Sequence, residues 1–223
     1  CVEVMSDVVF RIVPSVGAWY KAHHDEIPVT RQAVYDKLKH LELPTAAGLV
    51  EYAGRELGAC LQQMPSPPPP LLPGYRLRVL DGNHLAGTDH RVKELRCHRA
   101  AALPGHALVF YDPQWEVATE VIPCEDAYAQ ERTLLPEVVP MVKKGDCIVA
   151  DRNFCTLAFL FGIARQGGFF VIRHHAANVV GHPQGPRRGV GHDARGQALY
   201  EQAVSLTEPD TGATLVVRRL TVQ

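Results

Sequence analysis

The sequence lacks the features that would assign it to several large protein classes. No apolar run approaches the roughly 20 residues needed to span a bilayer, and no signal-peptide pattern opens the chain. There is no internal repeat, no P-loop or dinucleotide-binding glycine pattern, and no serine elbow of the α/β-hydrolase type. The 223 residues are 46% hydrophobic and 21% charged, which is typical of a globular protein of one domain or two. We therefore expect a cytoplasmic protein that does not contact membranes.

Paired cysteines are also absent. The six cysteines form no C-x-x-C motif, and several lie in apolar runs, which favours buried thiols in a reducing compartment over disulfides or a zinc site. Four histidines lie close together in the chain, but they are spread over Gly/Pro-rich sequence: His174, His175, His182 and His192. Without paired cysteines nearby, this spacing favours a solvated loop over zinc.

The chain has no excess of one charge, since its formal net charge is −1. The distribution is nevertheless uneven. Residues 152–223 hold eight basic and four acidic side chains, and all eight cations are arginines. The guanidinium group suits bidentate contact with phosphate, so this region is a candidate for contact with nucleic acid. A solvated basic face is an equally good interpretation.

A proline-rich segment, residues 65–74, divides the chain. Proline lacks a backbone donor and fixes φ, so this segment predicts a stiff linker. Residues 1–64 before it are typical of helices. Thr30 is a plausible N-cap for a helix to about Leu41, and a second helix is expected from Thr45 to about Gln63, weakened by three glycines.

The first of these helices is similar to the second helix of a helix-turn-helix, which would place part of its polar face against DNA. The residues available for such contact are Arg31, Gln32, Tyr35 and Lys39. A solvated amphipathic helix is the alternative interpretation.

After the linker the pattern becomes mixed α/β. The expected order is β-β-β-α-β-α-β, with strands at Arg76–Asp81, Ala107–Tyr111, Glu116–Ile122, Cys147–Asp151 and Phe169–Arg173, and helices from Asp126 toward Lys143 and over Thr156–Gln166. The first strand alternates charged and apolar residues before Leu80, which predicts one wetter face. Three antiparallel strands followed by a helical crossover to a fourth strand are the ribonuclease H-like arrangement, in which strand four is parallel to strand one.

Two of these strands are expected to end on an aspartate. Asp81 closes the first and Asp151 the fourth, 70 positions apart in the chain. Because neighbouring parallel strands lie roughly 4.8 Å apart, the two carboxylates are expected to lie side by side. Carboxylate oxygens are the ligands that hard divalent cations prefer. The sequence therefore predicts a metal site there, with Asp81 and Asp151 as metal-binding and catalytic residues.

Three short motifs, Leu80–His84, Ala150–Phe154 and Gly168–Arg173, make residues 75–223 similar to the DDE transposases of the insertion sequence four family. The resemblance implies a ribonuclease H-like core, Mg²⁺ or Mn²⁺ as cofactor, double-stranded DNA as partner and a homodimer in the synaptic complex. It matches Asp81 and Asp151 to the first two catalytic carboxylates. It also places Arg152 and Arg173 near the site, where each would hold DNA phosphate or form a structural salt bridge.

The sequence departs from the family pattern at the third carboxylate. The family glutamate belongs to a Tyr-x-x-Arg-x-x-x-Glu helix, and this motif does not occur in the chain. Residues 75–180 would then be a partial core. Residues 181–223, with expected strands at Leu199–Leu206 and Thr214–Val222, would be the start of a β-rich insertion. Because the sequence also begins with Cys1 and stops inside an alternating pattern, we interpret it as a transposase fragment that is inactive alone.

Two alternatives to the transposase interpretation stay open. The same two aspartates would serve another ribonuclease H-like nuclease, and a non-catalytic DNA-binding remnant would need no third carboxylate. Two further acidic residues, Asp89 and Asp146, are interpreted as turn or strand-entry residues and not as ligands.

Overall fold

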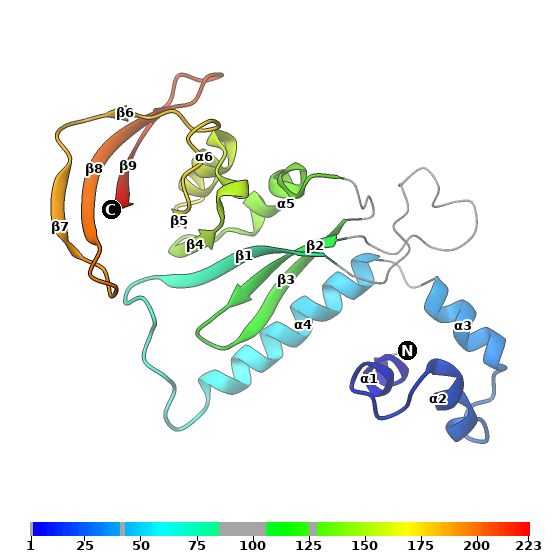
Figure 1. Cartoon of the computed structure of the whole chain (residues 1–223). Coiled ribbons are helices and arrows are strands. Elements are labelled where there is room, and N and C mark those ends of the chain that lie inside the picture. The colour runs from blue at the N-terminus through cyan, green and yellow to red at the C-terminus, as the bar shows by residue number, and fades with distance from the viewer. Residues whose placement is uncertain (1, 41–42, 85–105, 125–128) are drawn as a thin grey trace.

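The fold was analysed in a computed structural model, which describes residues 2–40, 43–84, 106–124 and 129–223 (Figure 1). Its central element is a five-stranded sheet in the order β3-β2-β1-β4-β5. The first three strands pair antiparallel, whereas β4 pairs parallel with β1 and β5 pairs parallel with β4. The strands are β1 (Arg76–His84), β2 (His106–Asp112), β3 (Val117–Cys124), β4 (Asp146–Ala150) and β5 (Phe169–Ile172). The expected mixed α/β architecture is thereby confirmed.

Strand β1 is longer than the sequence predicted. It continues to His84 because β2 supplies hydrogen-bond partners beyond the apolar run, and Asp81 pairs with Val109. The parallel pairing with β4 stops earlier, at Leu80 and Ala150. Asp81 therefore lies inside β1, contrary to the prediction that it ends the strand, although it lies just past the segment of β1 that pairs with β4.

One face of the sheet carries the main hydrophobic core. Leu80, Phe110 and Ile148 of the sheet pack against Phe159 and Ile163, which belong to helix α6 (Leu157–Arg165). The hydroxyl of Thr156 caps α6 by accepting from the Phe159 N–H at 3.3 Å, so the helix begins where the sequence predicted.

The sequence predicted that the charged residues of β1 lie on a solvent-exposed face, but Arg78 does not. This side chain is 0% exposed, because its guanidinium stacks on the Phe110 ring and binds two carboxylates, Asp146 and Glu120. Its Nη1 also donates to the Met141 carbonyl at 2.9 Å. The alternating pattern predicted that Arg78 is exposed to solvent, but its ion pairs with residues distant in the chain allow its burial.

The single helix expected between β3 and β4 is divided, over the described residues, into three short consecutive helical segments. These are η2 (Glu131–Leu134), α5 (Leu135–Val138) and η3 (Val139–Met141). Pro136 and Pro140 lie in the first two positions of α5 and η3, where a missing N–H is tolerated. The proposed cap, Asp126, lies outside the described residues.

Four helices precede the sheet: α1 (Val2–Val9), α2 (Val16–His23), α3 (Arg31–Lys39) and α4 (Leu43–Gln62). The predicted cap at Thr30 is confirmed, since its hydroxyl accepts from Ala33 N–H at 3.2 Å. Helix α4 lies along β3, on the side of the sheet away from α5 and α6 (Figure 1). A Cβ at Gly54 would come within 2.5 Å of the Ala118 carbonyl oxygen. The glycine that lowers helix propensity thus permits this close approach.

The proline-rich segment is held against the turn between β2 and β3. Gln114 accepts from the Leu71 N–H at 2.8 Å and donates to the carbonyls of Pro68 and Pro69 at 3.0 and 3.1 Å. That residues 1–64 and 75–180 are separate units, joined by this segment, stays a prediction.

A second sheet follows β5. It contains β6 (His182–Pro183), β7 (Arg188–His192), β8 (Ala198–Thr207) and β9 (Thr214–Val222), with β8 pairing with the other three. The two long strands agree with the sequence, whereas β6 and β7 form in Gly/Pro/His-rich sequence where no strand was predicted. Val204 and Leu206 of β8 pack with Leu160 and Phe161 of α6, so this sheet is anchored on the helix that also covers the main core.

Candidate metal centre at the ends of two parallel strands

The parallel pairing of β1 with β4 sets the position of the two predicted aspartates. Its last partners are Leu80 and Ala150, and each is followed directly by an aspartate, Asp81 or Asp151. Neighbouring strands are about 4.8 Å apart, so the backbone positions of Asp81 and Asp151 are adjacent by register. The pairing depends on the whole β4 strand and cannot slip by one residue without moving Ile148 out of the core.

Each aspartate is exposed and uses one oxygen locally. Asp81 Oδ1 accepts from the Gly82 N–H at 2.9 Å. Asp151 Oδ1 accepts from the Asn153 N–H at 2.7 Å and caps the short turn η4 (Arg152–Phe154). Neither is paired with a cation among the described residues. Two exposed carboxylates at adjacent positions fit a hard divalent ion such as Mg²⁺ or Mn²⁺, although the described residues contain no group of three His, Cys, Asp or Glu side chains arranged to hold a metal.

A further carboxylate, which the sequence analysis did not identify, lies at the same end of β1 but on the Gly82 face of the strand, opposite to the face that carries Asp81. Glu131 of η2 accepts from the Asn153 side-chain amide at 2.9 Å. A Cβ built on Gly82 would come within 1.8 Å of the glutamate Oε1, so the carboxylate lies on the Gly82 backbone. No local signal marks Glu131, because it lies 50 positions after Asp81 and 20 before Asp151. Its hydrogen-bond partner Asn153 belongs to the Ala150–Phe154 motif, and this motif could have indicated that a residue such as Glu131 lies nearby.

The two arginines matched by resemblance, Arg152 and Arg173, are both exposed. The Arg173 N–H donates to the Ala150 carbonyl at 3.2 Å, which fixes its backbone beside the end of β4. Within the described part of the chain neither arginine pairs with a carboxylate, so the alternative of a structural salt bridge finds no support there.

The four residues suggested for DNA contact lie on α3, away from the aspartates in sequence. Arg31, Gln32 and Tyr35 are exposed. Gln32 donates to Asp36 at 2.9 Å, so its amide is partly engaged within the helix. Lys39 is the last residue of α3. Their role in binding DNA stays a prediction.

Asp146, Asp89 and the histidines are the other residues, of types that bind metal ions, that the sequence analysis considered. Asp146 begins β4, is 1% exposed and pairs with Arg78 at 3.0 Å, which confirms its interpretation as a strand-entry residue. Among the described histidines, including His174 and His182, no metal-binding group forms. Asp89 lies outside the described residues.

The cysteines described include two buried thiols, Cys147 and Cys155. Burial raises the pKa of both, and the backbone N–H of His175 partly opposes this for Cys155. Cys60 is exposed on α4. Together with Cys124, which is also buried, they agree with the expectation that several cysteines lie in apolar surroundings.

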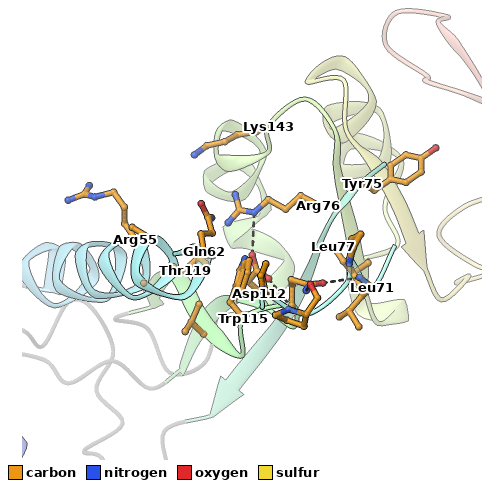
Figure 2. A pocket seen from close by; sticks show the side chains of 18 of the residues that line it. Arg55, Gln62, Leu71, Tyr75, Arg76, Leu77, Asp112, Trp115, Thr119 and Lys143 are labelled. Carbon is orange, nitrogen blue, oxygen red and sulfur yellow. Dashed lines mark hydrogen bonds and ion pairs between the residues drawn. The ribbon is translucent and has the colours of Figure 1, made fainter. Parts of the chain in front are cut away.

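A hollow of about 840 Å³ lies at the opposite end of β1. Helix α4, the proline-rich segment and the β2–β3 turn surround it, and Figure 2 shows Arg55, Arg76 and Lys143 along it. Arg76 is paired with Asp112 at 3.4 Å, and Glu51 and Glu120 also line the hollow. Three acidic and three basic residues line it, so the lining carries no excess of one charge.

Comparison with known proteins identifies no relative: no family model matches the chain, and no curated protein is significantly similar to it. In the residues that the structure describes, none of the helices combines the length and the apolar character needed to cross a membrane.

Proposed function

We propose that this chain is part of a DNA transposase of the DDE type, related to the insertion sequence four family, with a ribonuclease H-like core. In this proposal Asp81 and Asp151 bind Mg²⁺ or Mn²⁺ for the cleavage and transfer of DNA strands. The proposal rests on the motifs around these two residues and on the geometry of their strands.

The observation that supports it most is the register of β1 and β4. The sheet order β3-β2-β1-β4-β5, antiparallel over the first three strands and parallel over the last three, is the order that a ribonuclease H-like core requires. In this order, the strands that precede Asp81 and Asp151 are direct neighbours. A different strand order would leave two unrelated acidic residues far apart.

The chain's own residues have simple roles in this function. Asp81 and Asp151 supply solvent-exposed oxygens that a cation can reach without rearrangement of the fold. They would hold divalent ions, which would supply polarisation of a phosphodiester and stabilisation of the departing oxyanion. Arg152 and Arg173, exposed beside the same strand ends, would contact DNA phosphates, and α3 would add contacts through Arg31, Gln32, Tyr35 and Lys39.

The test is ion binding by the purified chain, measured by calorimetric titration with MnCl₂. Asp81→Asn and Asp151→Asn should each lose most of the affinity. Asp210→Asn, in an exposed turn of the second sheet, is the matched control and should bind as the unaltered chain does. Equal affinity in all four proteins would contradict the proposal.

DNA binding gives a second readout. The arginines of residues 152–223 should give a largely non-specific affinity for DNA. This affinity should fall as the salt concentration rises, because the release of counterions from DNA becomes less favourable. Nicking of transposon-end DNA is expected only from a chain that also contains the glutamate helix. Asp81-dependent nicking by this chain alone would favour the other nuclease, and DNA binding without ion binding would favour the non-catalytic remnant. The homodimeric state and the cytoplasmic location stay predictions.

A further inference from the structure

The second sheet carries arginines on both of its faces, and the two faces differ in what neutralises them. On one face, guanidinium nitrogens of Arg188 and Arg218 lie 3.7 and 3.8 Å from the carboxylate of Glu201. On the opposite face lie Arg187 and Arg219, and no carboxylate pairs with either of them among the described residues. One face therefore balances part of its charge, whereas the other keeps two unbalanced cations.

Neutral groups of strand β8 hold these two guanidiniums in place. Tyr200 and Gln202 are two positions apart on β8, so they share a face of the sheet. Cζ of Arg187 lies 4.1 Å from the centroid of the Tyr200 ring. Arg219 is the register partner of Gln202 and donates to its side-chain oxygen. Gln202 is held in turn, because its Nε2 donates to the Gly185 carbonyl at 2.8 Å.

Anchoring by neutral groups restricts an arginine without cancelling its charge. A guanidinium that stacks on a ring keeps the N–H groups in its own plane free, as Arg187 does on Tyr200. Arg219 gives one nitrogen to Gln202 and retains its other donors. Side chains that are ordered beforehand lose less freedom when a ligand binds. Because the guanidinium matches phosphate oxygens in a bidentate manner, this pair is suited to phosphate.

The spacing of the anchors also suits a nucleic acid backbone. Two residues of a strand span roughly 7 Å, which separates the positions of Tyr200 and Gln202. A DNA strand carries a phosphate about every 3.4 Å of helix axis, so both guanidiniums can contact one phosphodiester or two close ones. Arg187 occupies the face of the Tyr200 ring on which a base would otherwise stack. The contact is therefore to the backbone and independent of sequence.

We propose that Arg187 and Arg219 form a phosphate-binding pair that contacts the DNA backbone. This inference rests on the proposed function, which names DNA as the partner. It assigns the DNA affinity expected of residues 152–223 chiefly to two of their arginines. The contact needs no metal ion, because the pair lies on the second sheet, whereas Asp81 and Asp151 belong to strands of the first sheet or follow them.

The test compares two double variants that remove the same charge from opposite faces. Arg187→Gln with Arg219→Gln removes the anchored pair, and Arg188→Gln with Arg218→Gln is the matched control. Fluorescence anisotropy of a labelled duplex DNA of arbitrary sequence, measured in EDTA over a range of KCl concentrations, gives the slope of log affinity against log salt. The first variant should lower the magnitude of this slope by about 2, one for each lost phosphate contact. The control should change it much less, and equal changes in both would overturn the proposal.

A second pair of variants tests the anchor and leaves every charge in place. Tyr200→Leu removes the ring beneath Arg187, so the affinity for DNA should fall roughly two- to fivefold, the value of an exposed cation–π contact. Tyr200→Phe keeps the ring and should bind as the unaltered chain does. Unchanged affinity in Tyr200→Leu would overturn the role of the anchored geometry.

Two competitors identify the ligand. Inorganic phosphate should displace DNA no better than chloride of equal ionic strength does, and polyglutamate should bind far more weakly than DNA. Displacement by phosphate that depends on Arg187 and Arg219, or equal binding of polyglutamate, would overturn the assignment to DNA. Because these measurements contain EDTA, a failure of Mn²⁺ binding at Asp81 and Asp151 would contradict the proposed function without changing them.

Discussion

Strand β4 has an aspartate at each end, and the two lie in opposite environments. Asp146 begins the strand, is 1% exposed and accepts from Arg78 at 3.0 Å and from the Lys143 N–H at 2.9 Å. Asp151 follows the strand, is exposed and accepts from the backbone N–H of Asn153. The negative charge of Asp146 is neutralised inside the protein, whereas the charge of Asp151 is open to solvent.

This difference separates a structural carboxylate from a candidate ligand. A buried charge costs several kcal/mol unless a partner compensates it, so Asp146 depends on Arg78 and has no capacity left for a cation. Asp151 retains its hydration and loses little when it exchanges water for a metal ion. The surroundings of an aspartate, more than its presence at the end of a strand, therefore indicate what it does.

The largest expected effect is on the buried side of this comparison. Arg78→Met removes the cation between Asp146 and Glu120 and leaves a buried and a partly buried carboxylate without it. The free energy of unfolding should fall by about 3–5 kcal/mol, measured by urea denaturation. A loss below about 1 kcal/mol, as for exposed ion pairs, would show that solvent reaches the triad and would weaken the comparison.

The next effect is on the exposed side. At an Mn²⁺ concentration ten times the dissociation constant, binding to the folded chain should add about 1.4 kcal/mol to its free energy of unfolding. Asp151→Asn should abolish this gain. Thermal unfolding with and without MnCl₂ measures it, and Asp210→Asn is the control. A full gain in Asp151→Asn would mean that the ion binds elsewhere.

A partly paired carboxylate, Glu208, lies between the two cases. The Thr211 hydroxyl, which donates to it at 2.5 Å, and then Arg165 lower its pKa from the ordinary value of 4.5, against the opposing effect of burial. Because the folded pKa is the lower one, the stability it contributes is complete above pH 4.5 and is lost as the pH falls through the folded pKa. Glu208→Gln should therefore lose less stability than the unaltered chain when unfolding is compared at neutral and acidic pH. An equal loss in both would contradict this.

The smallest effect is expected for the aspartates without metal. Asp81→Asn and Asp151→Asn should each change the free energy of unfolding by no more than about 0.5 kcal/mol in a chelator, because asparagine keeps an oxygen for the local backbone N–H. Denaturation in EDTA measures this. A loss of several kcal/mol in either variant would make that aspartate structural, as Asp146 is.

Local patterns predicted much of the fold because their causes are local. Thr30 was expected as a helix cap, and it accepts the backbone N–H that such a cap satisfies; the helix expected from Thr156 begins there, with the Thr156 hydroxyl as its cap. The five core strands were recognised from apolar runs and turns. The segment between β3 and β4 was not, because the prolines at 136 and 140 divide it into turns too short for helical periodicity to describe.

The sequence by itself determined the five core strands, the Thr30 cap and the two aspartates that follow apolar runs, since each depends on residues within a few positions. Tertiary structure alone decided that Arg78 is buried, that Gly54 lets α4 approach Ala118, and that Glu131 reaches Gly82 and Asn153. These contacts join residues 22 to 68 positions apart. Their free energy depends on pairing and packing partners that no local pattern specifies, which is why the position of Glu131 was not predicted.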